Sequence, residues 1–280
     1  MSDFVIQAKA QNINTVTKFN RDLHNLLELL GQSDVQVLAN GTTFTIYETT
    51  SDYTEAKGTV EEASPITPLT IATTAAKTAT VDYKKYLYYT GIESIGKMGY
   101  EIAVGSKNEQ MLRDIQKSIR KQIVTTLASG TTKSESATGS AFQQQLADTW
   151  GAMQNVAADQ AGTAVYFVNP LDASKWLGTQ QIPPATAFGM TYLNSFFGTI
   201  IVDGNVPQGT VYGTMSGNLN VLAADVRGIE GFNFDTDETG IIALHNGAEY
   251  SRAAVESCAY TGLCILPSIA DHIVVNTVKA

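Results

Sequence analysis

The sequence contains little charge for its length. Asp, Glu, Lys and Arg make up 16% of the 280 residues, compared with about 25% in an ordinary soluble domain. Basic residues are the scarcer kind, with 18 Lys and Arg against 27 Asp and Glu, and the net charge is −9. Because binding to nucleic acid phosphates requires clustered cations, the surface as a whole is not expected to bind nucleic acid. Such low charge has two ordinary explanations: a surface of uncharged polar residues, or burial of much of the surface against other subunits.

Cysteine, histidine and long apolar runs are scarce too. If Cys258 and Cys264 lay on one extended strand they would be about 20 Å apart, too far for a disulfide, and we expect two free thiols in a reducing compartment. No apolar run reaches the roughly 18 residues of a membrane span, and the N-terminus does not resemble a secretory signal, so folding in a cytoplasm is expected. No metal site is expected either, because the three histidines share no ligand spacing with the cysteines; they are His24, His245 and His272.

Threonine, by contrast, is abundant. The chain has 33 Thr, and 13 of them lie between Thr42 and Thr80. This composition favours extended backbone but includes few large apolar side chains. It predicts a long two-stranded hairpin that leaves the body of the protein. Because an isolated hairpin is marginally stable in water, this one is expected to need another surface.

Two amphipathic helices are predicted by apolar residues at spacings of three and four, over residues 15–30 and 106–129. Ser106 and Glu109 match a capping box for the second helix, and Gly130 stands where a left-handed C-terminal residue belongs. The polar face of that helix carries the only concentration of basic residues in the chain. This is ordinary for a solvated face, but any anionic partner is also expected to bind there; the residues are Lys107, Arg113, Lys117, Arg120 and Lys121.

After a polar segment at 131–140, the second half of the chain has a different pattern, in which shorter helices and strands are predicted. The predicted elements are a helix over 142–156, a strand over 164–168, a short helix over 171–177, a loop over 178–191, strands over 199–202, 211–212 and 219–223, a strand pair over 229–234 and 241–245, and β structure over 252–278. The acidic residues Asp235, Asp237 and Glu238 are interpreted as a turn, because the twelve-residue ligand pattern of a calcium loop is absent. The predicted fold class is α+β.

One segment matches a motif for nucleotide chemistry. Residues 91–97, with Gly91, Gly96 and Lys97, fit G-x-x-x-x-G-K, and a later apolar strand ends in Asp203, like the strand that holds magnesium in such enzymes. However, Met98 occupies the place of the required Ser or Thr, and a glycine follows it. A nucleotide-binding enzyme is therefore an alternative that the sequence favours less. No catalytic, cofactor-binding or metal-binding residue is assigned.

The order of the predicted parts resembles the major capsid proteins of tailed bacteriophages, whose fold is shared with encapsulins and the floor of herpesvirus capsids. Residues 60–65 are similar to the acidic segment near the tip of that family's extended loop. Residues 196–202 and 206–213 are similar to its two strands around a V-P-x-G turn. The Val168-Asn169-Pro170 segment before Trp176 is also similar to its apical domain.

The resemblance implies a domain organisation. It consists of an N-terminal arm at 1–31, an extended loop at 42–89, a peripheral domain with a long spine helix at 32–41, 90–140 and 241–280, and an apical domain at 141–240. One branch of the family joins a loop Lys to an Asn of a neighbouring subunit; Lys57 and Asn276 have the required types, but nothing around them identifies them as such a pair.

The resemblance also implies a function. The chain would self-assemble as hexamers and pentamers into the icosahedral shell around the double-stranded DNA of a tailed phage. The DNA would be contacted weakly, and scaffolding, portal and decoration proteins would be the other partners. The protein would be found in the virion after assembly in the host cytoplasm, with no cofactor and no enzymatic activity. An encapsulin-like cellular shell is the further alternative. Contacts between subunits are expected at the loop tip, through Tyr53, Lys57, Glu61, Glu62 and Pro65.

Overall fold

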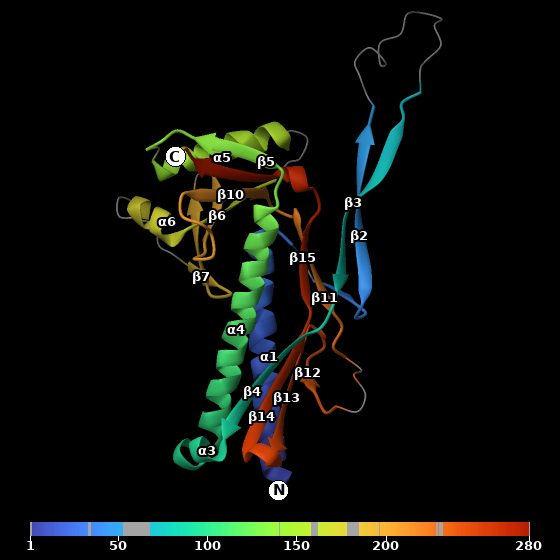
Figure 1. Ribbon diagram of the computed structural model, residues 1–280, viewed down its shortest axis with the longest axis vertical. Coiled ribbons are helices and arrows are strands. Elements are labelled where there is room, and N and C mark those ends of the chain that lie inside the picture. Colours follow the sequence, from blue (N-terminus) through green and yellow to red (C-terminus); the bar gives the residue numbers. More distant parts are fainter. Residues whose placement is uncertain are drawn as a thin grey trace, which may run out of the picture.

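The computed structural model describes residues 2–32, 35–52, 68–139, 141–157, 162–177, 185–195, 197–227, 229 and 232–279. The protein is α+β, as predicted. Two long helices run side by side through its length, a mixed sheet with two shorter helices forms the upper lobe, and an antiparallel sheet lies against the lower half of the helices (Figure 1). A two-stranded ribbon extends away from the body and is joined to it at its base. No helix among the described residues has the length and apolarity required to cross a membrane.

The central helices are α1 (Ser2–Leu30) and α4 (Tyr100–Ala128). Each has 29 residues and so is roughly 44 Å long. Their apolar faces share the main core, where Phe19 and Ile115 are fully buried. The helix predicted over 15–30 begins much earlier, at Ser2. Its first half escaped the apolar pattern because a polar residue, Asn12, occupies a buried position there.

The predicted start of α4 is wrong. The helix begins after Gly99, and the Ser106 hydroxyl donates to the Ala103 carbonyl oxygen inside the helix, over 3.0 Å. The expected left-handed glycine is wrong as well, because Gly130 is not among the residues with positive φ. Its role is close approach: a Cβ atom there would lie 2.6 Å from Cγ2 of Ile273.

The upper lobe is built on a seven-stranded sheet, in the order β5-β16-β10-β6-β9-β8-β7. Two of its pairs are parallel, β6 with β9 and β5 with β16. Helices α5 (Phe142–Val156) and α6 (Pro170–Leu177) pack against it, and both were predicted. The strands are β5 (Thr132–Ser136), β6 (Ala164–Val168), β7 (Ala185–Ala187), β8 (Met190–Ser195), β9 (Gly198–Val202), β10 (Thr210–Met215) and β16 (Ile273–Val278).

The hairpin of β7 and β8 and the combination of strands in this sheet were not predicted from the sequence. The loop predicted over 178–191 is wrong in its described part, where β7 and the start of β8 form a hairpin around Phe188 and Gly189, both with positive φ. The sheet also unites β5 and β16 with the strands of residues 164–215. The proposed boundaries at 140 and 241 therefore cut through one sheet, and the domain division itself remains a prediction.

The lower sheet is antiparallel, in the order β12-β13-β14-β4. The strand predicted over 229–234 is wrong for the described residues there, because pairing begins at Asp235. A smaller sheet, in the order β1-β11-β15, lies between the lower sheet and the ribbon (Figure 1). The elements are β1 (Gln36–Leu38), β4 (Lys84–Gly91), α3 (Ile92–Met98), β11 (Leu219–Ala224), β12 (Asp235–Thr236), β13 (Ile242–Glu249), η1 (Tyr250–Arg252), β14 (Ala254–Thr261), β15 (Leu263–Pro267) and η2 (Ala270–His272).

The two cysteines are free, as expected, but they do not share a strand. Cys258 lies in β14 and Cys264 in β15, which belong to different sheets. Burial raises the pKa of both thiols. They therefore act as small, partly buried side chains rather than as reactive thiolates.

Candidate functional site

The β2–β3 ribbon consists of β2 (Thr42–Ser51) and β3 (Ile71–Val81), paired antiparallel with one shift of register between Ile46 and Tyr47. Threonines face each other across the strands: the hydroxyl oxygens of Thr43 and Thr80 are 3.3 Å apart, and those of Thr45 and Thr78 are 3.4 Å apart. Such pairs stabilise a hairpin. The threonine-rich stretch thus forms the predicted excursion.

Within the described part of the ribbon, apolar packing against the rest of the protein lies at the base, and midway along β3 the Lys77 Nζ donates to the Ser129 hydroxyl over 3.2 Å. Val81 is fully buried with Leu222 and Ala224 of β11, and Phe44 packs against this small cluster. Just beyond β3, the Tyr83 hydroxyl donates to the carbonyl oxygen of Asp225, and burial raises the pKa of Tyr83. These contacts fix the direction in which the ribbon leaves the body.

The distal half of the ribbon is uncovered on both faces. Successive side chains of a strand point to opposite faces, yet all residues from 71 to 75 are exposed. Large apolar side chains are among the exposed ones: Tyr47 is 64% exposed and Ile71 is 69% exposed. Because a two-stranded ribbon is marginal in water by itself, this half requires a second body to cover it.

A second apolar surface, which is partly exposed, lies on the lower sheet, on the face turned away from the helices. The rings of Phe234 and Tyr260 are 4.8 Å apart, and Lys85 Nζ lies 5.7 Å from the Tyr260 ring. On the edge strand β4 of the same face, Leu87 is 47% exposed. The sequence did not reveal this aromatic face, because its residues are far apart along the chain and are brought together by the pairing of β12, β13, β14 and β4.

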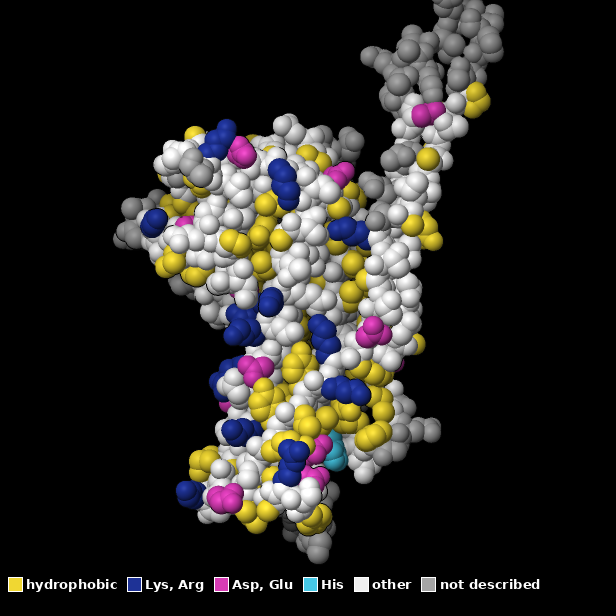
Figure 2. All heavy atoms as spheres, in the orientation of Figure 1, with side chains coloured by type: hydrophobic (Ala, Val, Ile, Leu, Met, Phe, Trp, Pro, Cys, Tyr) yellow, Lys and Arg dark blue, Asp and Glu magenta, His cyan; other side chains and the backbone are white. Residues whose placement is uncertain are grey.

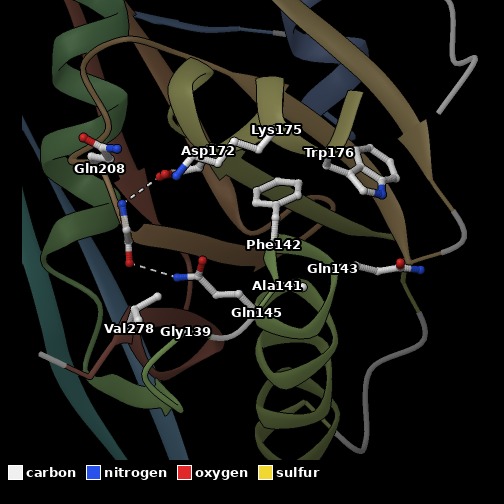
Figure 3. A pocket seen from close by; sticks show the side chains of 11 residues that line it. Gly139, Ala141, Phe142, Gln143, Gln145, Asp172, Lys175, Trp176, Gln208 and Val278 are labelled. Atoms are coloured by element: carbon white, nitrogen blue, oxygen red, sulfur yellow. Dashed lines mark hydrogen bonds between the residues drawn. The ribbon is translucent and has the colours of Figure 1, made fainter. Parts of the chain in front are cut away.

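The upper lobe contains a half-open cavity of about 660 Å³ between α5, α6 and the turn before β10. Figure 3 shows Phe142 and Trp176 beside it, with Asp172 and Gln145 directed toward the turn. The Gly209 backbone N–H donates to the Asp172 carboxylate, over 2.7 Å, and its carbonyl oxygen accepts from Gln145 Nε2, over 2.9 Å. Asp172 and Gln145 thus hold the backbone of the predicted V-P-x-G turn.

Comparison with solved structures identifies the architecture. No known protein-family model matches the sequence, and no curated protein matches it either. Solved structures do match. The match to the virus-like particle of Pyrococcus furiosus covers 93% of this chain and 98% of the chain in that structure, with a TM-score of 0.52 and 14% identity. The Mycobacterium phage Adephagia structure covers 88% of both chains, with a TM-score of 0.58 and 10% identity. The match to an encapsulin complex from Synechococcus elongatus covers 87% of this chain and 84% of the encapsulin chain, with a TM-score of 0.56 and 8% identity.

The chain has the fold of the phage major capsid family. This confirms the resemblance in fold that the order of sequence elements indicated. Within the capsid fold, the predicted contact residues Tyr53, Lys57, Glu61, Glu62 and Pro65 lie outside the described residues.

The structure does not favour Asn276 as the acceptor of a crosslink. Asn276 is fully buried in β16, between β5 and β10. Its amide oxygen accepts from the Ser136 hydroxyl over 3.1 Å, and its amide nitrogen donates to the Ser134 hydroxyl, also over 3.1 Å. A lysine of another subunit would have to open the sheet to reach it.

The nucleotide-binding alternative is wrong in its geometry. Gly91 ends β4, an edge strand of an antiparallel sheet, whereas Gly96 and Lys97 lie inside helix α3 instead of in a phosphate-binding loop. Asp203 follows β9 in the upper lobe, at the other end of α4 (Figure 1). Its carboxylate accepts from the Asn205 backbone N–H over 2.8 Å. The two halves of the motif never meet.

The acidic segment is occupied by contacts with α1. Asn12 Nδ2 donates to Asp235 over 2.8 Å, and Asn20 Nδ2 donates to Asp237. Asn12 Oδ1 accepts from Asn246 of β13, over 2.6 Å. These side chains fasten α1 to the lower sheet. Among the described residues, no group of three or more His, Cys, Asp or Glu side chains is placed to hold a metal ion.

Proposed function

We propose that this protein is the major capsid protein of a tailed bacteriophage, forming hexamers and pentamers in the icosahedral shell around double-stranded DNA. The observation that carries the proposal is the β2–β3 ribbon, whose distal half is exposed on both faces. Such a ribbon becomes stable when it lies on a neighbouring copy. The virion is the place of the assembled protein, and the host cytoplasm is where it assembles.

Assembly rests on many contacts made at once. Each subunit extends its ribbon over one neighbour and is covered by the ribbon of another neighbour. Contacts that are individually weak therefore act at high effective concentration. The tip residues Tyr53, Lys57, Glu61, Glu62 and Pro65 are proposed to touch the neighbour. The low charge of the chain fits this role, because cores of protein interfaces are depleted of charged residues. The role is structural and not enzymatic, with scaffolding, portal and decoration proteins as further partners.

An encapsulin-like cellular shell is the second candidate, because the matched structures include an encapsulin complex. The two candidates share a fold and differ in what they enclose. Genes for a portal and a terminase next to this one would support the phage shell. Their absence, together with a neighbouring gene for a protein that copurifies inside the shells, would support the cellular one.

Sedimentation of the purified protein tests the shell proposal. We expect shells or capsomers, visible as closed particles by negative-stain electron microscopy, rather than a 30.0 kDa monomer. A sharp monomer peak at micromolar concentration, unchanged by salt, would overturn the proposal.

The role of the ribbon is tested by deleting residues 52–72. The base of the ribbon keeps its contacts, so the variant is expected to fold with an unchanged circular dichroism spectrum and to lose assembly. A milder variant replaces the exposed Tyr47 and Ile71 with Ser, and its matched control replaces Leu171, which is 59% exposed in α6. Unaltered shells from both ribbon variants would remove this role, whereas loss of assembly only in the ribbon variants would support it.

A further inference from the structure

Helix α4 carries a concentration of positive charge that contrasts with the acidic balance of the whole chain. Between Lys107 and Lys121, α4 has five basic and two acidic residues, although acids outnumber bases in the whole sequence. We call Lys107, Arg113, Lys117, Arg120 and Lys121 the basic stripe. It extends over roughly 21 Å of helix. Figure 2 shows Lys and Arg side chains along the course of α4 where the molecule narrows below the upper lobe.

In the described part of the subunit, the basic stripe keeps its charge unpaired. Lys107, Arg113, Lys117 and Lys121 are exposed, and among the described residues no ion pair joins any of them to a carboxylate. The nearby Asp114 carboxylate is engaged on the other side, where it accepts from the Tyr88 hydroxyl and from Gln110 Nε2. The excess of positive charge therefore faces outward, toward whatever lies beyond the helix.

The partner that fits this face is a polyanion rather than a protein surface. The only large hydrophobic residue of α4 that is exposed, within the part the structure describes, is Ile102, which precedes the stripe. Between the cations stand short or amide side chains such as Gln110, Gln116 and Ser118. Protein interfaces have apolar cores depleted of charge, whereas Lys, Arg, Ser and Gln side chains are those that contact the phosphates of nucleic acids.

We propose that the basic stripe contacts the phosphate backbone of nucleic acid enclosed by the shell, which places α4 on the inner wall. This inference rests on the proposed shell function and adds the residues that meet the cargo. Each cation neutralises one phosphate and reads no base, so the contact is independent of sequence and falls steeply with salt. A few contacts per subunit hold the cargo weakly, and the many copies of a shell repeat them.

The test compares two variants of the full-length chain with equal loss of charge. The stripe variant carries Lys107→Gln, Arg113→Gln, Lys117→Gln and Lys121→Gln; Arg120 is kept because it donates to the Gly189 carbonyl oxygen. Gln is nearly as good a helix former as Lys or Arg, so α4 is expected to remain intact. The matched control removes four exposed cations elsewhere, with Lys9→Gln, Arg21→Gln, Lys97→Gln and Lys175→Gln.

Two quantities are measured: binding of unassembled protein to a short fluorescent duplex of random sequence over a range of salt, and nucleic acid recovered in purified shells. For the stripe variant we expect the plot of log K against log salt to flatten by roughly 0.9 per lost phosphate contact. Its shells should hold less nucleic acid than those of the wild type. The control variant should keep nearly the wild-type slope and content.

Each contrary result has a distinct meaning. Equal losses in both variants would show an effect of net charge and overturn the inference. If the stripe variant formed shells with the wild-type salt slope of DNA binding and the wild-type content of nucleic acid, the inference would be overturned and the shell function would stand. If the stripe variant bound DNA normally but failed to assemble, the stripe would face an acidic surface of another copy, which also overturns the inference. If the wild-type protein stayed monomeric but bound DNA with a salt dependence that the stripe substitutions reduce, the shell function would be overturned instead.

Discussion

At the scale of single residues, the distance to the neighbouring backbone decides whether a glycine can be replaced by a residue with a side chain. Gly198 begins β9 with φ of +133°, and a Cβ atom there would lie 2.2 Å from the Ala164 carbonyl oxygen of β6. Gly151, in the middle of α5, has nothing within 4 Å of the same imagined atom. The sequence presents both as glycines beside apolar residues, and only the packing distinguishes them.

We therefore expect opposite effects of alanine at these two positions. Gly198→Ala should lower the free energy of unfolding by about 2 kcal/mol or more, because strain in φ adds to overpacking against a carbonyl group. Gly151→Ala should raise it by about 0.5–1 kcal/mol, because glycine is a poor residue inside a helix. Urea unfolding of unassembled protein measures both. Equal effects of the two variants would contradict this account of Gly198.

At the scale of elements, hydrogen bonds between partly buried polar side chains hold a helix in a fixed position against a sheet. The Tyr88 hydroxyl of β4 donates to the Asp114 carboxylate of α4. This bond, with desolvation as a further cause, raises the pKa of Tyr88 to about 12. Like the bonds of Asn12 and Asn20 on α1, it couples a helix to the lower sheet.

Tyr88→Phe should reveal this coupling in its dependence on pH. A raised pKa in the folded state means that the contribution of the hydroxyl to stability is fully present below the ordinary tyrosine pKa near 10. It is lost as the pH rises through about 12. At neutral pH we expect the variant to be less stable by about 1 kcal/mol, with the difference shrinking above about pH 10. Tyr250→Phe, at a residue that is 91% exposed, should change nothing. A difference that stays constant up to pH 12 would contradict the assigned hydrogen bond.

At the scale of the whole molecule, three exposed surfaces of the described residues fall into two chemical kinds. The β2–β3 ribbon and the aromatic face of the lower sheet expose apolar side chains, which suit contacts between copies of the chain. The basic stripe of α4 exposes cations with almost no apolar neighbours, which suits a polyanion. A subunit with both kinds of surface can build a wall and also touch what the wall encloses.

Hydrogen exchange should show where assembly covers the subunit. Backbone amides at 71–75 of the ribbon are expected to exchange at least about tenfold more slowly in shells than in unassembled protein, since assembly suppresses local opening. Strand β6, buried along its whole length, serves as the control and should exchange equally slowly in both states. Equal exchange of the ribbon in the two states would show that it remains uncovered after assembly.

Elements whose side chains report local periodicity were predictable. The helix over 142–156 and the strand over 164–168 were predicted with their observed bounds, because each buries a regular apolar pattern. The capping box at Ser106 failed because tertiary packing of Ala103 and Val104 extends α4 backward past a favourable local start. The first half of α1 was missed because hydrogen bonds, and not hydrophobicity, hold Asn12 in its buried position.

By itself, the sequence determined the α+β class, the threonine-rich hairpin, the scarcity of charge and the concentration of bases on one helix, because these depend on composition and short-range periodicity. Only the tertiary structure decided that residues 71–75 of the hairpin are exposed, that the buried side-chain amide of Asn276 is already hydrogen bonded, and that the motif around Lys97 is a helix remote from Asp203. These facts depend on which segments meet in space.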